Sequence, residues 1–391
     1  MSDLLKPTQS SGNSILTSLV RIAPGALTIG RPLPWEVYDS DGSVLLCQGY
    51  VIQNDSQLEQ LFERGLFKPR IIEVHQEGNE ASGDGADCNP FARYPDYLHT
   101  LENALAAVAN GEPEAHGQIQ DLAHALERAC IHAPDSCLAL VHLYSTGPTI
   151  HEQIIFYAIL CQLIARQFGL DEQRIPVLTE AALSANLALV PIADKLNAVN
   201  KVLNSEQRSV ISKHPQRSIL ALQAAGIDND LLFTIIAQHH EQADGSGYPK
   251  GLSGADIRPE AEILALAERY IAMITKRAYR KRMNVTAARK LIANLADGTF
   301  RPALPKALLQ ILGEYPPGTL VRLENNEVGV ITGRPVRARG PFVQIVFDAS
   351  GKSSDARLER DTSVPYFGIQ ALEEPDIMPS MNFSSMWGFP D

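Results

Sequence analysis

The stretch HHEQADGSGYPKGL, residues 239–252, gathers side chains that can do chemistry into one short span. His239 and His240 are adjacent, and two acids, the second of them Asp244, follow them before a glycine turn leads into Tyr248. Imidazole is the commonest metal ligand among side chains, and glycine lets the backbone approach a ligand closely. The pattern therefore predicts half of a metal centre, and the remaining ligands must come from elsewhere in the chain.

The residues before the two histidines favour a helix. In LLFTIIAQHHEQ, which starts at Leu231, apolar pairs recur at four-residue spacing, and both histidines fall on the same inward face. Imidazoles about 100° apart on a helix can serve neighbouring metals. The alternative is a pair of core histidines with ordinary hydrogen-bond partners, which is the commoner fate of a lone histidine. The adjacent pair, the acids and the Gly245-Ser246-Gly247 hinge favour the metal.

Helical spacing dominates the chain from Tyr94 to about Leu312, in segments such as YLHTLENALAAVA, IQDLAHALERACIHA and EAEILALAERYIAMITKRAYRKR. The most apolar segment, IIFYAILCQLIARQFGL from Ile154, is interrupted by Gln162 and Arg166. It predicts an amphipathic core helix, and no segment is expected to be long and apolar enough to cross a membrane.

The two ends of the chain differ from this helical middle. Short apolar runs separated by turn signals in residues 19–76, with one short helix at NDSQLEQLFERG, predict a small β-rich N-terminal domain. The alternating segments around YPPGTLVRLENNEVGVITGRP predict a C-terminal β-hairpin extension that turns at Asn325-Asn326. The expected organisation is a β-rich domain in 1–76, a linker in 77–91, a helical domain in 92–312, the β extension in 313–375 and a loose tail in 376–391.

Composition narrows the possible functions. With 391 residues and 45% apolar content, the chain can fill a real core, so it is a folded protein. A formal net charge of -11 argues against binding nucleic acid polymers, although a local arginine cluster could still hold a small anion. Five cysteines without CxxC pairing predict reduced thiols, and the N-terminus carries no secretory signal. We expect a cytoplasmic protein without membrane insertion.

The 239–252 stretch also belongs to a longer pattern. HHEQADGSGYPKGLSG resembles the HHExxDGSGYPxGLxG signature of HD-GYP domains, bacterial phosphohydrolases that open cyclic di-GMP with a two- or three-metal centre. The resemblance extends upstream through IADKLNAVNKVLNSEQRSVISKHP and downstream through AEILALAERYIAMITKRAYR, and covers roughly residues 140–312. It implies a mainly α fold, an HD-type helical bundle, for the middle of the chain, and a role in cyclic di-GMP signalling.

This sequence departs from the family at the residues that hold metals. The family's His-Asp pair falls on Ala185 and Asn186, and the lysine that follows falls on Leu189. Alanine has no donor atom, and a neutral amide cannot bridge two dications. The family's first histidine lies opposite Gln153, and His151 could replace it only if the alignment shifted by two residues. The resemblance therefore implies that the two-metal centre is not assembled.

Four metal-ligand positions of the resemblance persist, with His214, His239 and His240 retained and Glu268 in place of the family's aspartate. His214, His239 and Glu268 could together hold one divalent ion, iron or manganese, because three protein donors usually suffice. Absence of any metal is the expected alternative. Glu268 could instead pair with an arginine near the core.

The nucleotide-contacting positions look better preserved. Tyr248, Arg277 and Arg280 match residues that contact the nucleotide in HD-GYP enzymes, and Asp244 is grouped with them as a predicted ligand-binding residue. Guanidinium groups bind phosphate in bidentate fashion and read the O6/N7 edge of guanine. The alternative is a solvated basic helix end. Asp194 also matches a family acid, but it suits a solvated turn equally well.

Three functions follow from these residues. The preferred hypothesis is a degenerate HD-GYP protein that binds cyclic di-GMP without hydrolysing it, or that binds signalling proteins of the same network. The second is an active metal-dependent cyclic di-GMP phosphodiesterase with a reduced metal site. The third is an interaction scaffold that needs no nucleotide, and this rests on analogy from fold to function alone. A homodimer is compatible with each of them.

Overall fold

The computed structural model describes most of the chain from residue 88 onward, and shorter pieces before it. After residue 88 the description leaves out 146, 194–203, 277–280, 296–297, 336–339, 355–357, 375–380 and 390–391, and before it covers only 19–21, 33, 36–38, 43–47, 50–52, 57 and 67–69. The chain divides into two compact units, Met1–Gly78 and Asn79–Asp391. Each unit is described below by itself.

The N-terminal unit contains a small antiparallel sheet. Its strands are β1 (Leu19–Arg21), β2 (Val37–Tyr38), β3 (Val44–Leu46) and β4 (Phe67–Pro69), and they pair in the order β1-β4-β2-β3. Val37 and Ile52 are fully buried and Leu33 nearly so. The predicted β-rich character of this unit is confirmed. Of the helix predicted at 54–65, only Gln57 lies within the described residues, and it is helical.

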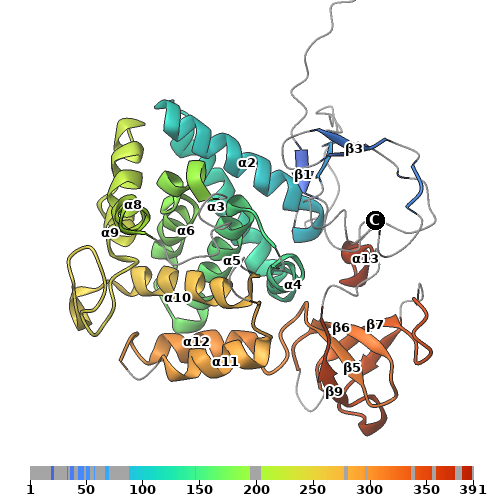
Figure 1. The fold of residues 1–391 in the computed structure, drawn as a ribbon. Helices are drawn as coiled ribbons and strands as arrows, with labels where there is room; N and C mark the ends of the chain where they lie inside the picture. The colour runs from blue at the N-terminus through green and yellow to red at the C-terminus, as the bar shows by residue number, and fades with distance from the viewer. Residues whose placement is uncertain are drawn as a thin grey trace, which may run out of the picture. The chain divides into compact units, whose positions relative to one another are not determined.

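The second unit is built mainly from helices, as predicted (Figure 1). In chain order these are α2 (Pro90–Asn110), α3 (Ala115–His132), α4 (Pro134–Tyr144), α5 (Ile150–Phe168), η1 (Glu172–Arg174), α6 (Ile175–Ser184), η2 (Leu187–Ile192), α8 (Ser205–Ala224), α9 (Asp230–Gln238), η3 (Gly254–Asp256), α10 (Pro259–Ile274), α11 (Val285–Asn294) and α12 (Ala303–Leu312).

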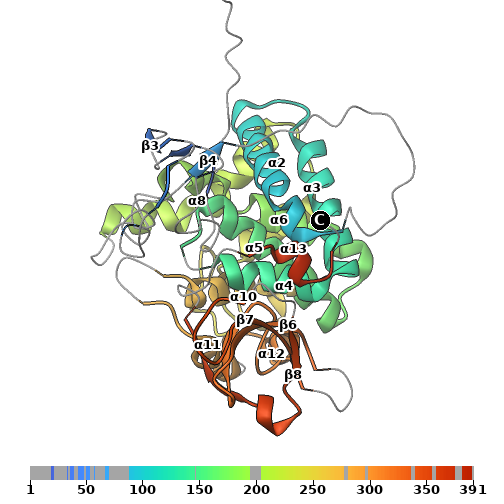
Figure 2. The same cartoon turned by 90° about the vertical axis from the view of Figure 1, so that its right-hand side faces the viewer.

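Helix α5 is the centre of this unit and contacts α2, α3, α4, α6, α10 and α12 (Figure 2). Its residues 152–165 are all buried, so the helix is enclosed on every side. That is the position expected of a helix that is apolar all round. The side chain of Thr149 and the carboxylate of Glu152 form a capping box at its start, and Gly169 ends it in the left-handed conformation.

The C-terminal extension is a five-stranded antiparallel sheet in the order β8-β7-β6-β5-β9. The predicted turn lies between β5 and β6, where Asn326 has a φ of 67°. Along β5, Leu320 faces the helical core, whereas Val321 belongs to a separate small core of the sheet. The hairpin extension is therefore confirmed, with strands β5 (Leu320–Leu323), β6 (Val328–Gly333), β7 (Phe342–Phe347), β8 (Glu359–Asp361) and β9 (Ile369–Leu372), and a one-turn helix η4 (Pro365–Phe367).

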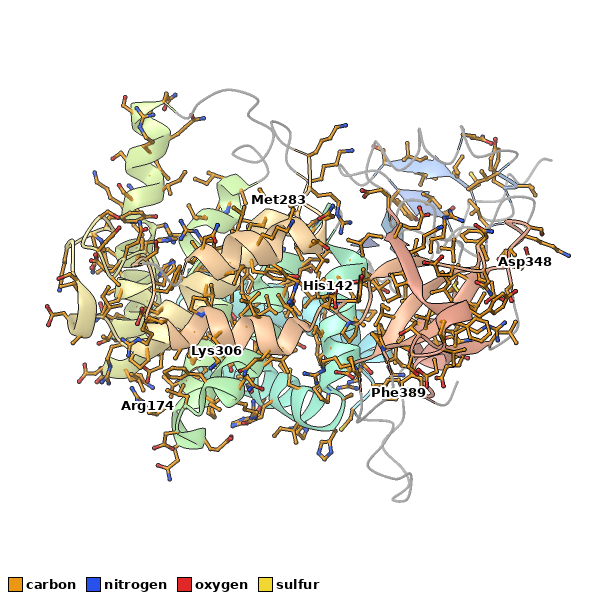
Figure 3. The ribbon with its side chains drawn as sticks, turned by 90° about the horizontal axis from the view of Figure 1, so that it is seen from below. His142, Arg174, Met283, Lys306, Asp348 and Phe389 are labelled. Atoms are coloured by element: carbon orange, nitrogen blue, oxygen red, sulfur yellow. The ribbon has the colours of Figure 1, made fainter. Side chains whose placement is uncertain are left out.

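Two polar contacts tie α4 to its neighbours, and Figure 3 labels one of them, His142, in the interior of the unit. The imidazole of His142 is 2.8 Å from the Tyr270 hydroxyl of α10 and 2.8 Å from the Leu138 carbonyl. At the start of α4, the Asp135 carboxylate accepts hydrogen bonds from the backbone and guanidinium of Arg334, just after β6. Helix α4 thus connects α10 to the C-terminal sheet.

The predicted loose tail is wrong for residues 381–389. A short helix, α13 (Phe383–Met386), packs against α2, and the ring of Phe383 lies 5.8 Å from that of Phe91. The indole of Trp387 lies 4.9 Å from the same Phe91 ring. Aromatic burial holds this segment, and the scattered Met, Ser and Pro residues of the tail concealed it.

One part of the described chain passes a length and composition test for a membrane-spanning helix, namely Glu172–Ile192, contrary to the expectation that none would. It covers η1, α6 and η2, and 61% of its most apolar window is buried inside the protein. Packing within the helical core accounts for its apolar character.

Candidate metal centre

Three histidines from different segments converge into one cluster. His214 comes from α8, His239 caps the C-terminal end of α9, and His240 follows it. Each offers one ring nitrogen that lies within 4.8 Å of the other two. The sequence predicted that the two adjacent imidazoles would lie on a helix and serve neighbouring metals. Instead α9 ends at Gln238, and both rings meet His214 at a single point.

Backbone carbonyls fix which nitrogens face this point. The Nδ1 atom of His214 is 2.6 Å from the Ile211 carbonyl, and Nδ1 of His239 is 2.7 Å from the Ile236 carbonyl. A carbonyl only accepts hydrogen bonds, so each Nδ1 carries the proton and each Nε2 presents a lone pair. The two Nε2 atoms are 3.3 Å apart.

Two facing lone pairs at this distance require a cation between them. A shared proton would supply it only if one ring were an imidazolium, but burial lowers the pKa of both His214 and His239 to about 4. Nitrogen ligands at about 2.1 Å from one ion are roughly 3.0 to 3.4 Å apart for bond angles between octahedral and tetrahedral. The observed separation fits chelation of one ion.

The third histidine is held by ring contacts. Its ring lies 4.0 Å from that of His239 and 5.0 Å from that of His214. Burial first, and then the neighbouring imidazoles, lower the pKa of His240 well below its ordinary value. All three rings are therefore neutral at neutral pH, which is the form that ligates metals.

Glu268 of α10 reaches the edge of the cluster and is held there by Asn186. Its Oε2 atom is 3.9 Å from Nε2 of His239, and its Oε1 atom accepts a 2.5 Å hydrogen bond from the Asn186 amide. Burial raises the pKa of Glu268 to about 7, against the opposing effect of that hydrogen bond. Among the described residues its partner is an amide, where the sequence had allowed for an arginine.

This donor set fits one ion and does not fit a bridged pair. Two metals about 3.5–4 Å apart need a carboxylate shared between them. Ala185, which is fully buried, offers no donor, and Asn186 offers an amide that is committed to Glu268. Three imidazole nitrogens with one carboxylate nearby suit Fe²⁺, Mn²⁺ or Zn²⁺.

The residues that were alternatives for the missing histidine lie elsewhere. Gln153 is buried, donates to the Pro148 carbonyl and accepts from the Tyr157 hydroxyl. His151 faces α2, where its Nδ1 atom is 3.7 Å from the Glu102 carboxylate. His151 therefore does not replace the family's first histidine.

A loop that begins directly after His240 covers the cluster. Glu241, which is 3% exposed, anchors it by accepting hydrogen bonds from the backbone of Lys250 at 2.7 Å and of Leu252 at 2.9 Å. A Cβ atom at Gly247 would come within 2.5 Å of the Glu241 Cα and the His240 carbonyl oxygen, so only glycine fits there. Sequence reasoning counted Glu241 among the acids but missed this anchoring role.

The loop positions the predicted ligand-binding residues differently. Tyr248 stacks on His240, with ring centroids 4.7 Å apart, and its peptide bond to Pro249 is cis. Asp244 is exposed on the outer side, where its carboxylate accepts hydrogen bonds from the backbone and hydroxyl of Ser246. These contacts shape the loop. Arg277, Arg280 and Asp194 lie outside the described residues.

Comparison with known proteins places this site in a family. Residues 127–304 match the HD domain family. Cyclic di-GMP phosphodiesterase PA4108 of Pseudomonas aeruginosa is 28% identical over 260 residues, which cover 64% of this chain and 62% of that protein. Cyclic di-GMP phosphodiesterase PdeB of Borreliella burgdorferi is 28% identical over 174 residues, or 44% and 46% of the two chains.

This chain is a member of the HD-GYP family. The fold of the HD-GYP protein described here is also similar to that of Bd1817, an HDG"Y"P protein from Bdellovibrio bacteriovorus, with a TM-score of 0.53 and 18% identity over 75% of this chain and 99% of the other. The chain spans about three fifths of the first curated relative and less than half of the second. The predicted HD-type fold is confirmed.

Proposed function

We propose that this HD-GYP protein binds cyclic di-GMP without hydrolysing it and holds one divalent ion at His214, His239 and His240. The observation that carries the proposal is the hydrogen bond from Asn186 to Glu268, because it occupies the place where a bridging carboxylate would be needed. The names of the two curated relatives support cyclic di-GMP as the ligand.

The chain's own residues suit a receptor. The three neutral imidazoles hold the ion, which when bound supplies positive charge for a phosphate group. The Glu241 anchor and the stack of Tyr248 on His240 fix the covering loop against the cluster, so a ligand would meet a prearranged surface. We keep Arg277 and Arg280 as proposed contacts to guanine and phosphate, in line with their sequence positions.

Calorimetric titration tests the receptor. Cyclic di-GMP should bind the manganese-loaded chain, and chromatography of the same mixture should find neither pGpG nor GMP. A titration without heat at high micromolar ligand would remove the receptor proposal while leaving the metal site untouched. 3'3'-cGAMP, in which adenine replaces one guanine, serves as the specificity control.

A His239→Gln variant tests the metal site separately. It should lose at least roughly 10- to 100-fold in metal affinity, the range already found when an outer-shell partner of a ligand is removed. Metal content after dialysis is the measurement, and His151→Gln is the matched control, since His151 pairs with Glu102 away from the cluster. Equal metal content in both variants would show that the ion is held elsewhere.

The three-histidine cluster itself favours a second candidate, a phosphodiesterase with a reduced metal site. A single ion can still activate or polarise a substrate oxygen, so activity does not strictly need a pair. Release of pGpG or GMP with Fe²⁺ or Mn²⁺, abolished by a chelator and by His239→Gln, would establish this candidate. Equal recovery of partner proteins with and without cyclic di-GMP would favour the scaffold over both.

A further inference from the structure

Two buried cysteines meet at the corner between α3 and α4, far along the chain from the histidine cluster. Cys130 lies in the last turn of α3 and is 2% exposed, and Cys137 lies in the first turn of α4 and is 1% exposed. Ala133 ends one helix and caps the next, and the turn there brings the two thiols into hydrogen-bond contact. Both are free thiols.

One member of the pair can be reached from outside. Cys130 lines an open groove of about 570 Å³, with Ile131 and Leu163 on its apolar side and Arg166 and Arg334 at its rim. The side chain of Ile131 is 52% exposed at this groove. A small uncharged oxidant therefore has a route to Cys130, whereas Cys137 is behind it.

We propose that Cys130 and Cys137 form a dithiol that hydrogen peroxide converts reversibly into an intramolecular disulfide. The Cys130 sulfur attacks one peroxide oxygen, the O–O bond breaks, and water leaves with a sulfenic acid on Cys130. The Cys137 sulfur then attacks the Cys130 sulfur, the S–O bond breaks, and a second water leaves. In total two thiols and one peroxide give one disulfide and two waters.

The order of the two steps follows from the environment of the thiols. The hydrogen bond with Cys130 and then burial raise the pKa of Cys137 well above its ordinary value, so Cys137 stays protonated. It is poorly suited to meet the oxidant first, but it is already in contact with the sulfenic acid that it must attack. This arrangement favours resolution to a disulfide over further oxidation of Cys130.

The cross-link would act on a segment that joins two parts of the unit. Asp135 lies between the two cysteines in sequence and holds Arg334 at the end of β6. A disulfide between residues 130 and 137 would therefore restrain the start of α4, where the C-terminal sheet is attached.

Peptide mapping of the full chain tests the proposal. Folded protein is treated with hydrogen peroxide, the remaining thiols are blocked, and cleavage before Asp135 separates Cys130 from Cys137. A linked pair of peptides that has lost two hydrogens, and that dithiothreitol separates, is the expected result. Cys88→Ser, Cys161→Ser and Cys47→Ser should retain the link, and Cys130→Ser and Cys137→Ser should lose it.

Two outcomes would overturn the proposal. One is wild-type protein that remains unlinked at peroxide concentrations that fully oxidise the exposed Cys47. The other is a link that forms equally well in urea, because it would then owe nothing to the folded corner. Both measurements use the wild-type chain, so the proposal stays testable even if a cysteine variant fails to fold.

Discussion

Asn186 decides how the site differs from a two-metal centre. Its identity was visible in the sequence, and its loss of charge was the basis for predicting a silent site. Its partner was not visible, because Glu268 lies 82 residues further along the chain and nothing local indicates the contact. The convergence of His214 with His239 across 25 residues was equally hidden, although the residue types themselves suggested a metal.

Asn186→Asp tests the amide at this position. In metal-free protein the change removes a hydrogen bond to a charged group and sets two carboxylates against each other, so the free energy of unfolding should fall by about 1.5–3 kcal/mol. Mn²⁺ should restore much of this loss, because the carboxylate pair can then bind an ion, and metal content should rise above that of the wild type. Urea denaturation with and without Mn²⁺ measures the first effect.

The control for that variant is Asn294→Asp, at the exposed end of α11. It adds the same charge without a buried partner, so its unfolding free energy should change by less than about 0.5 kcal/mol, with no response to Mn²⁺. If Asn186→Asp behaved like this control, the amide would not be what limits the site.

At the scale of elements, periodicity predicted the helices well, and tertiary contacts decided their ends. Apolar spacing placed α5 and α10 correctly as core helices, because burial alone dictates that pattern. The end of α9 was missed by two residues, since the sequence pattern runs on through His239 and His240. What stops the helix is the covering loop, whose anchor on Glu241 reaches nine and eleven residues ahead.

Gly247→Ala tests how far the covering loop depends on this close approach. The added methyl group would overlap the backbone of Glu241 and His240, which cannot move aside as a side chain could. We expect a loss of about 1–3 kcal/mol in the free energy of unfolding together with weaker metal binding. Gly117→Ala on α3, where nothing lies within 4 Å of the new methyl, should be neutral or slightly stabilising. Matching losses in both variants would contradict this account of the loop.

The link from α4 to α10 predicts a dependence of stability on pH. Burial lowers the pKa of His142 from 6.5 to about 4 in the folded protein. Between these values the unfolded chain binds the proton and the folded chain does not, so stability is complete above pH 6.5 and declines as the pH falls toward 4. The contribution that His142 loses over this window is about 3 kcal/mol.

His142→Gln separates this effect from that of the other histidines. The variant should be less stable at pH 7.5, because the contacts to Tyr270 and Leu138 are weakened. Its stability should nevertheless fall less steeply with acid, by about 1.4 kcal/mol per pH unit within the window. Urea denaturation at several pH values checks this, and parallel curves for the two proteins would mean that His142 does not titrate on unfolding.

The whole molecule combines features that composition predicted with one that it concealed. The β-rich start, the helical middle and the β extension each have a distinct period in the sequence, and their fold class follows from it. The C-terminal segment has no period, since it is held by a few aromatic contacts to α2, some 290 residues earlier in the chain. Such contacts can be recognised only once the chain is folded.

Phe383→Ala measures what this last contact contributes. The ring is 9% exposed and lies against Phe91 and Tyr144, so its removal leaves a cavity at the edge of the helical core. The free energy of unfolding of the second unit should fall by about 3 kcal/mol. Tyr366→Ala is the matched control, because it deletes an aromatic ring that is 67% exposed in the same C-terminal region and should cost less than about 0.5 kcal/mol. If both variants proved equally stable, the C-terminal segment would be a passenger on α2, and the aromatic contacts would have no part in holding the helical core.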